Sequence, residues 1–309
     1  MAENAVKNSP DESLRHLRRK GFLIAGLGVL LLSPDSLLVK STSVTPLVFL
    51  FWRGLLLALG FLVINGLRYR GRLVQEMVRC GWPGLYCGLA FGLSTLGFVT
   101  GVKYTAAGNV LVILNTAPVI AALLGWLIWK ERLPTRTWVL IVVCVGGATL
   151  MAVGEMGKGE PLGLLMAGLA AFALASNLAV ARSRSGVDMS VMLIVGALAL
   201  ALVCALLGGA QWPGWRDMGL ILLLCLGFLP AASILIQTGP RYLPAAEVSL
   251  LLLLETVIGT FLVWLFLGEV PPVLGFIGGG LILASLAANA IYEEWRGRRA
   301  RIRPALPPK

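Results

Sequence analysis

The chain of 309 residues has few charged residues and a single histidine. Charged residues make up 13% of it, about half of the roughly 25% found in soluble domains. The single histidine, His16, lies in a basic leading segment, which excludes Ser/His catalysis within the apolar part of the chain. The sequence has no GxxxxGK[ST] phosphate-binding loop for ATP. The five cysteines lack both CxxC spacing and histidine neighbours, so we expect no metal or haem site, no cofactor and no enzyme activity.

Apolar residues dominate instead, at 58% of the chain with a mean hydropathy of +0.86. A membrane-spanning helix needs about 20 apolar residues, so we predict an all-α integral membrane protein with ten transmembrane helices. The expected spans are 21–39, 46–66, 81–101, 108–129, 137–154, 162–181, 189–209, 218–238, 246–267 and 272–292. Two polar tails, 1–20 and 293–309, remain outside the spans.

The basic residues lie mostly on one side of this predicted topology. Ten spans put both tails on the same side, and 21 of the 26 Lys and Arg residues fall there. Four fall on the opposite side, and Arg53 lies inside a span. The positive-inside rule then places both termini in the cytoplasm. We therefore expect a protein of the inner membrane whose net charge of +11 reflects orientation and contact with lipid, not nucleic-acid binding.

The second half of the chain resembles the first. The offset that aligns Tyr104 with Tyr242 also aligns Trp126 with Trp264 and Glu131 with Glu269. This match predicts two repeats of five helices, 21–154 and 162–292. Because five is odd, the second repeat enters the membrane from the opposite face, so the repeats are inverted. Inverted repeats recur in secondary transporters, which expose a site near the membrane midplane to each side in turn.

Several short motifs occur in a characteristic order. The first two spans contain Lys40 and Phe51-Trp52-Arg53. The region of the fourth and fifth spans contains Pro118-Val119, Trp126, Lys130-Glu131-Arg132-Leu133 and Gly146-Gly147. The equivalent region of the second repeat contains Leu267-Gly268-Glu269-Val270 and Gly278-Gly279-Gly280. With these motifs, residues 21–292 resemble the drug/metabolite transporter superfamily, EamA type. The resemblance implies a ten-helix carrier with a central cavity between its halves, often an exporter of amino acids or other small metabolites. It leaves the substrate open, because the superfamily also handles sugars, nucleotide sugars and cationic drugs.

Three charged side chains lie within predicted spans, where each costs roughly 2.5–3.5 kcal/mol near a helix centre. Arg53 is about 10 Å from the outer end of its span, Glu255 is near the midplane, and Asp35 is about one turn from an outer end. In one interpretation Arg53 binds a substrate carboxylate, while Glu255 or Asp35 faces an ammonium group or carries a proton. In the other, Arg53 pairs with one of the acids, or Asp35 reaches the outer water.

Neutral polar residues cluster at similar depths in the spans: Ser94, Thr95, Asn115, Thr116, Ser176, Asn177 and Thr256. Together they are predicted to line a hydrated cavity, although for each alone a hydrogen bond between helices is the better explanation. Pro118 removes a backbone hydrogen bond in mid-span and is predicted to be a kink or hinge. Glu131 and Glu269 are expected to cap equivalent helix ends. The GxxxG spacing of Gly84, Gly88 and Gly92 predicts close helix packing.

The sequence thus favours a secondary transporter that exports a small metabolite by alternating access, with amino acids or related compounds as the preferred substrates. The expected partners are the substrate, the lipid bilayer and, as a candidate coupling ion, the proton. The protein is expected to be a monomer or homodimer. The alternatives are export of cationic drugs, organic anions or nucleotide-related metabolites, and a membrane scaffold that transports nothing.

Overall fold

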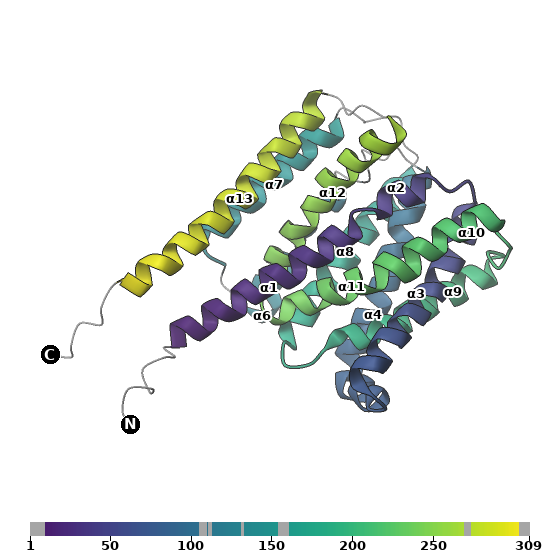
Figure 1. Cartoon of the computed structure of the whole chain (residues 1–309), viewed down its shortest axis with the longest axis horizontal. Helices are drawn as coiled ribbons and strands as arrows, with labels where there is room; N and C mark the ends of the chain where they lie inside the picture. Colours follow the sequence, from purple (N-terminus) through teal and green to yellow (C-terminus); the bar gives the residue numbers. More distant parts are fainter. Residues whose placement is uncertain are drawn as a thin grey trace.

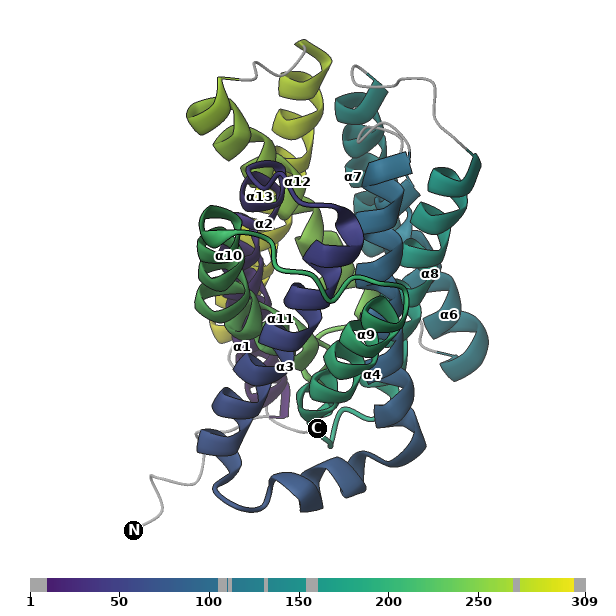
Figure 2. The same cartoon turned by 90° about the vertical axis from the view of Figure 1, so that its right-hand side faces the viewer.

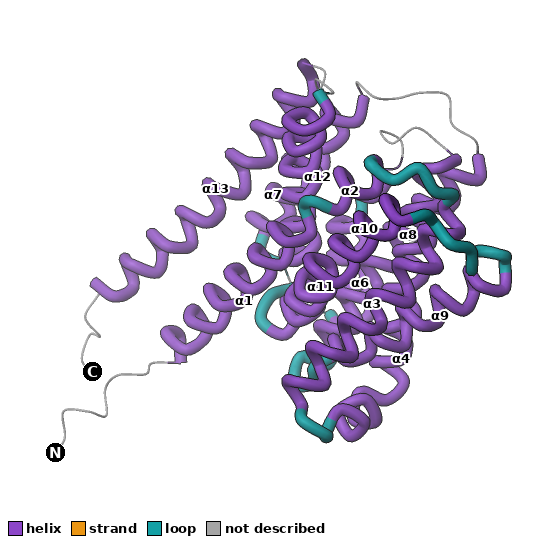
Figure 3. The backbone as a smooth tube through the Cα atoms, turned by 45° about the vertical axis from the view of Figure 1, so that its right-hand side comes forward, coloured by secondary structure: helices purple, strands orange, loops and turns teal. Residues whose placement is uncertain are grey.

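The computed structural model describes residues 10–104, 110, 113–130, 133–153, 161–268 and 273–302. All secondary structure in these ranges is helical (Figure 3), which confirms the predicted all-α class. Seven helical stretches are long and apolar enough to cross a membrane, and Ala117–Trp129, Thr135–Leu150 and Val273–Asn289 are shorter apolar helices. The count of ten spans stays a prediction. Glu131 and Glu269, the expected helix caps, lie outside the described residues.

The elements follow the two predicted halves of the chain. The first half contains α1 (Pro10–Leu32), α2 (Asp35–Lys40), α3 (Pro46–Tyr69), α4 (Leu73–Tyr104), α6 (Ala117–Trp129) and α7 (Thr135–Val153). The second contains α8 (Pro161–Ser183), η1 (Met189–Met192), α9 (Leu193–Leu206), α10 (Trp215–Leu222), the π-helix η2 (Leu223–Phe228), α11 (Leu229–Thr238), η3 (Gly239–Arg241), α12 (Ala245–Leu267) and α13 (Val273–Ile302).

Prolines coincide with interruptions in three of the predicted spans, because proline lacks the backbone N–H that continues a helix. A turn at Ser33 and Pro34 separates α1 from α2, and a π-helical turn precedes Pro230 at the start of α11. In the fourth span the turn lies at Asn115 and Thr116, so Pro118 occupies the first turn of α6. The backbone therefore departs from the helix just before Pro118; whether this point acts as a hinge stays a prediction.

The helices of the two halves pair symmetrically. The second, fourth and fifth helices of each half contact their equivalents: α3 packs on α9, α6 on α12, and α7 on α13. The third helix of each half packs on the first helix of the other, as α4 on α8 and α11 on α1. Figure 1 shows α7 beside α13, and α3 and α9 face the viewer in Figure 2. This exchange of partners is what a two-fold relation produces, and it supports the inverted arrangement.

Glycine permits the closest of these helix contacts. A Cβ on Gly196 of α9 would overlap the carbonyl oxygen of Gly88 on α4, and a Cβ on Gly92 would lie 2.6 Å from the carbonyl oxygen of Gly196. The GxxxG spacing in α4 thus lets two backbones meet, as predicted. Further along α4, a Cβ on Gly97 would lie 2.6 Å from the carbonyl oxygen of Met166 on α8. Such contacts hold α4, which forms one wall of the cavity described below, against the second half.

Charged contacts join the two halves at the end where α1 begins and α13 ends (Figures 1 and 3). Arg18 of α1 donates to both carboxylate oxygens of Glu247 on α12, at 2.9 and 3.0 Å. Asp188, which precedes η1, accepts from the Tyr69 hydroxyl at 2.7 Å and pairs with Arg68 at 2.9 Å. We call these contacts the terminal-end clamp. Because Arg18, Arg68 and Tyr69 belong to the first half and both acids to the second, the clamp ties the halves together.

Candidate functional site

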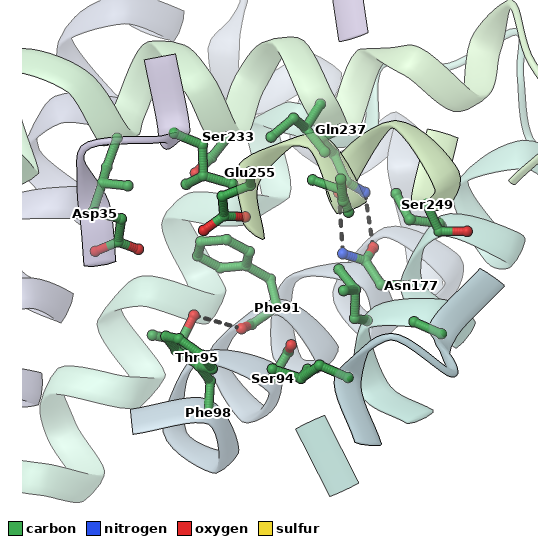
Figure 4. Close-up of a pocket in the computed structure, with 18 of the residues that line it drawn as sticks. Asp35, Phe91, Ser94, Thr95, Phe98, Asn177, Ser233, Gln237, Ser249 and Glu255 are labelled. Carbon is green, nitrogen blue, oxygen red and sulfur yellow. Dashed lines mark hydrogen bonds between the residues drawn. The ribbon is translucent and has the colours of Figure 1, made fainter. Parts of the chain in front are cut away.

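A cavity of about 190 Å³ lies among helices of both halves (Figure 4). Its polar and aromatic lining consists of Asp35, Arg53, Phe91, Ser94, Thr95, Phe98, Asn115, Asn177, Ser233, Gln237, Ser249, Glu255 and Thr256. At about 30 Å³ per water molecule, the cavity has room for about six waters. Pockets for drug-sized ligands measure roughly 300–1,000 Å³, so this space fits a small metabolite better.

The structure brings most of the predicted site residues to this cavity. Asp35, Arg53, Asn115, Asn177, Glu255 and Thr256 line it, together with Ser94 and Thr95. Thr116, Ser176 and Pro118 are not among the lining residues. The Thr116 hydroxyl donates to the carbonyl of Ile113 at 2.6 Å, and Ser176 accepts from the Tyr86 hydroxyl at 2.8 Å. Ser176 thus takes part in a hydrogen bond between helices, the alternative given above, whereas Thr116 bonds within its own turn.

The lining follows the internal repeat position by position. The offset that aligns Tyr104 with Tyr242 pairs lining residues of the third and fourth helices with lining residues of the eighth and ninth: Phe91 with Leu229, Thr95 with Ser233, Phe98 with Ile236, Leu114 with Leu252, Asn115 with Leu253 and Ala117 with Glu255. The first and sixth spans align at a different offset, of 142 residues, which pairs Asp35 with Asn177. The cavity therefore lies where equivalent surfaces of the two repeats face each other, but the carboxylates of Asp35 and Glu255 have uncharged equivalents, Asn177 and Ala117.

Arg53 and Asp35 form a buried ion pair in the wall. The two terminal nitrogens of the guanidinium donate to the two carboxylate oxygens, at 2.6 and 2.7 Å, and both side chains are at most 8% exposed. The turn at Pro34 places Asp35 at the start of α2, opposite α3. The Nε of Arg53 has no hydrogen-bond partner among the described residues. Of the two interpretations of Arg53, the structure thus shows the one in which it pairs with an acid.

Glu255 of α12 differs from Asp35 in having no hydrogen-bond or ion-pair partner among the described residues. Within the described part of the chain, its carboxylate makes no hydrogen bond and no ion pair, although Asp35 and Arg53 are near enough to act on it electrostatically. Figure 4 shows Glu255 on the same side of the cavity as Asp35 and Ser233, with Phe91 of α4 extending toward it. The acidic groups therefore gather in one part of the cavity.

Amide groups occupy another part. Asn177 of α8 and Gln237 of α11 donate to each other through reciprocal hydrogen bonds of 3.0 and 2.8 Å, and Figure 4 shows them near Ser249. Asn115 is also buried, but its Nδ2 lacks an acceptor in the described ranges. Ser233, Gln237 and Ser249 were not among the site residues predicted from the sequence. A polar amide inside an apolar run could have marked Gln237 as a candidate for the cavity. Because Gln237 is close to the expected end of its span, where polar side chains reach water, the amide did not stand out.

Comparisons with known proteins agree with this architecture. The sequence profile of the EamA-like transporter family matches residues 19–153 and again 161–290, which confirms the predicted repeat. No curated protein matches the chain significantly. Among 28 matching chains of solved structures, one titled "Crystal structure of protein" shares 21% sequence identity with a TM-score of 0.73. The alignment covers 90% of this chain and 98% of that one, so the fold is shared. Since the family profile accounts for most of the chain, the protein belongs to the EamA-like transporter family of the drug/metabolite transporter superfamily.

Proposed function

We propose that this protein is a secondary transporter that exports a small metabolite with an ammonium group, preferably an amino acid or a related compound, across the inner membrane. The observation that carries this proposal is Glu255, a carboxylate without a partner among the described residues, on the wall of a cavity between two repeats of a transporter family. A buried charge without a counter-ion is costly. A substrate that brings the opposite charge removes that cost, and this gain in free energy favours its binding.

The pairing of the helices supports alternating access as the mechanism. Equivalent helices of the two repeats pack on each other, so rocking one repeat against the other would open either end by equivalent movements. Two interruptions of the helices lie at the cavity, and each supplies a lining residue: Asp35 after the turn at Pro34, and Asn115 in the turn before α6. Interrupted helices at a midplane site recur in secondary transporters.

A membrane scaffold explains these features less well. Packing between helices requires no cavity, and a scaffold gains nothing from an unpaired carboxylate within a membrane span. In contrast, a carrier needs a site that is polar enough to hold its substrate and unsatisfied when empty. The proton remains a candidate coupling ion, because a carboxylate that alternates between two sides of a membrane can carry one.

Counterflow in proteoliposomes tests this function. Vesicles are loaded with unlabelled amino acids, organic cations, carboxylates or sugars, and uptake of the same labelled compound is measured with and without a pH gradient. We expect exchange of an amino acid or related ammonium compound and its loss in Glu255→Gln. The matched control is Glu76→Gln, because Glu76 lies outside the cavity and pairs with Arg79 on the same helix at 3.7 Å. Absence of exchange for the whole panel would contradict the proposal and favour a scaffold.

A second candidate, export of organic cations, is favoured by the Arg53–Asp35 pair. Because Asp35 already accepts from both terminal nitrogens of Arg53, the charge of the guanidinium is compensated within the protein, and only its Nε is left without a partner among the described residues. Exchange of organic cations without exchange of amino acids would select this candidate.

A further inference from the structure

The charges that line the cavity do not balance. Its ionisable lining residues within the described ranges are Arg53, Asp35 and Glu255. Arg53 and Asp35 neutralise each other through two short hydrogen bonds. Glu255 is left over, so the site with Glu255 ionised carries one net negative charge, which a bound cationic group or a proton can compensate.

The fold does not require this charge. The repeat equivalent of Glu255 is Ala117, which also lines the cavity, and the equivalent of Asp35 is Asn177. Equivalent backbone positions are therefore built without acids in one repeat. Because the equivalent position in the first repeat carries an alanine, the carboxylate of Glu255 is better explained by what the cavity binds than by a need of the fold.

The remaining lining is suited to a cation and to neutral polar groups. Phe91 and Phe98 of α4 supply aromatic rings, whose faces attract cations. Asn177 and Gln237 satisfy each other, and Asn115 offers an amide donor without an acceptor among the described residues. An amide N–H donates equally well to a carboxylate, an ester or an amide carbonyl. Nothing in this set requires the substrate to carry a negative charge.

We propose that Glu255 selects the ammonium group of the substrate and that the substrate's carboxylate is dispensable, so that amines and amino-acid amides are carried at least as well as the parent amino acids. This inference rests on the proposed function and narrows it. The Arg53–Asp35 pair is then a fixed part of the wall, and Asn115 serves any hydrogen-bond acceptor of the substrate. A substrate that lacks the ammonium group leaves Glu255 uncompensated and is rejected.

Probes that lose one charged group at a time test this selectivity in counterflow at pH 6. The first series is leucine, leucinamide, 3-methylbutylamine and 4-methylpentanoate; the second is phenylalanine, phenylalaninamide, phenethylamine and 3-phenylpropanoate. Protein-free vesicles measure passive leakage of the amines. We expect the amide and the amine to exchange at least as fast as the amino acid, and the carboxylate that lacks nitrogen not to exchange.

Variants connect the selectivity to named residues. Glu255→Gln is expected to slow exchange of all ammonium probes by about thirtyfold or more, as for loss of one partner of a buried charge pair. Glu255→Asp, which keeps the charge, is expected to keep the preference for ammonium probes. This variant is the control that separates loss of the charge from loss of the folded protein. In the double variant Asp35→Asn with Arg53→Gln, the ratio of amide to amino-acid exchange is expected to stay within about twofold of that in the parent.

Each other outcome has a definite meaning. If leucine or phenylalanine exchanges but its amide and amine do not, the carrier function stands and the carboxylate is required, which overturns the inference. The inference is also overturned if the double variant loses amino-acid exchange alone, because Arg53 then binds the carboxylate. Exchange of the carboxylates at the rate of the amino acids would do the same. If no probe moves in either series, the proposed function itself fails.

Discussion

At the scale of single residues, the cavity contains two asparagines whose surroundings differ. Both side chains are at most 4% exposed. Asn177 is satisfied by Gln237 in two hydrogen bonds, whereas the Nδ2 of Asn115 has no acceptor among the described residues. This difference separates a residue that holds the protein together from one that is available to a ligand.

Replacing Asn177 should therefore mainly affect stability. Asn177→Ala leaves the buried amide of Gln237 unpaired, which is expected to cost about 1–3 kcal/mol of stability. Thermal unfolding in detergent, followed by intrinsic fluorescence, measures this loss. An unchanged unfolding temperature would show that the reciprocal amide pair contributes nothing to the fold.

Replacing Asn115 should mainly affect transport. Asn115→Ala removes a donor that makes no hydrogen bond in the described part of the structure, so we expect an unfolding temperature close to that of the parent protein. We expect the apparent KM for the transported compound to rise, because the substrate loses a hydrogen bond worth about 1 kcal/mol, or about fivefold. A large loss of stability with an unchanged KM would contradict this assignment.

Asp188 gives the terminal-end clamp a dependence on pH. Burial alone would raise the pKa of Asp188, but hydrogen bonds from Tyr69 and Ser190 and the charge of Arg68 together hold the pKa below its ordinary value. A carboxyl group with a depressed folded-state pKa stabilises the folded protein above its unfolded pKa of about 4, and this contribution is lost as pH falls through the folded-state value. We expect the unfolding temperature to drop on acidification below about pH 4, and Asp188→Asn to show a smaller drop.

At the scale of secondary-structure elements, the crossing of α4 and α9 depends on the absence of side chains. Gly196→Ala would place a Cβ against the carbonyl oxygen of Gly88, which belongs to the backbone and cannot turn aside. Overpacking of this kind typically costs about 1–3 kcal/mol and occasionally more. Gly219→Ala in α10 is the matched control, since nothing lies within 4 Å of the added Cβ there. Equal unfolding temperatures for the two variants would rule out the close crossing.

The sequence predicted the elements better than it predicted their interruptions. Runs of apolar residues identify spans because each helix must satisfy its backbone within the membrane, and the GxxxG spacing correctly indicated close contact in α4. The fourth span was expected to bend at Pro118, but the turn lies at Asn115 and Thr116. Proline disturbs the residues that precede it, and the exact place of the turn depends on packing that a single sequence does not contain.

The candidate site was predictable in the same uneven way. Charges inside spans indicated Arg53, Asp35 and Glu255, which all line the cavity. A charge within the membrane is costly and is therefore usually found in an ion pair or beside a hydrated cavity. Their pairing was open, since sequence gives depth in the membrane but not the direction in which a side chain points. Ser176 shows this limit most clearly: it is adjacent to Asn177, yet it turns away from the cavity to Tyr86.

At the scale of the whole molecule, the terminal-end clamp ties the two halves together by contacts that must break if this end opens. Cys80 is adjacent to the clamp, since its thiol lies 3.5 Å from the backbone carbonyl oxygen of Asp188. Only 2% of Cys80 is exposed. Opening this end would therefore uncover a cysteine that is now buried.

Weakening the clamp should increase that exposure. In a variant that keeps Cys80 as its single cysteine, Asp188→Asn combined with Glu247→Gln is expected to raise the rate of maleimide labelling at least several-fold. The corresponding variant with Cys144 alone is the control, because Cys144 is buried in α7, away from the clamp. An equal increase at both cysteines would indicate general loosening, and no increase at Cys80 would show that the clamp does not control this end.

The Arg53–Asp35 pair also bears on how the protein enters the membrane. Asp35 and Arg53 lie in the first two spans, 18 positions apart in the sequence, and an unpaired charge within an inserting helix is costly. Because both partners belong to the same leading hairpin of helices, they can neutralise each other as soon as that hairpin has left the ribosome. Biogenesis of the first two spans therefore does not have to wait for the synthesis of the second repeat.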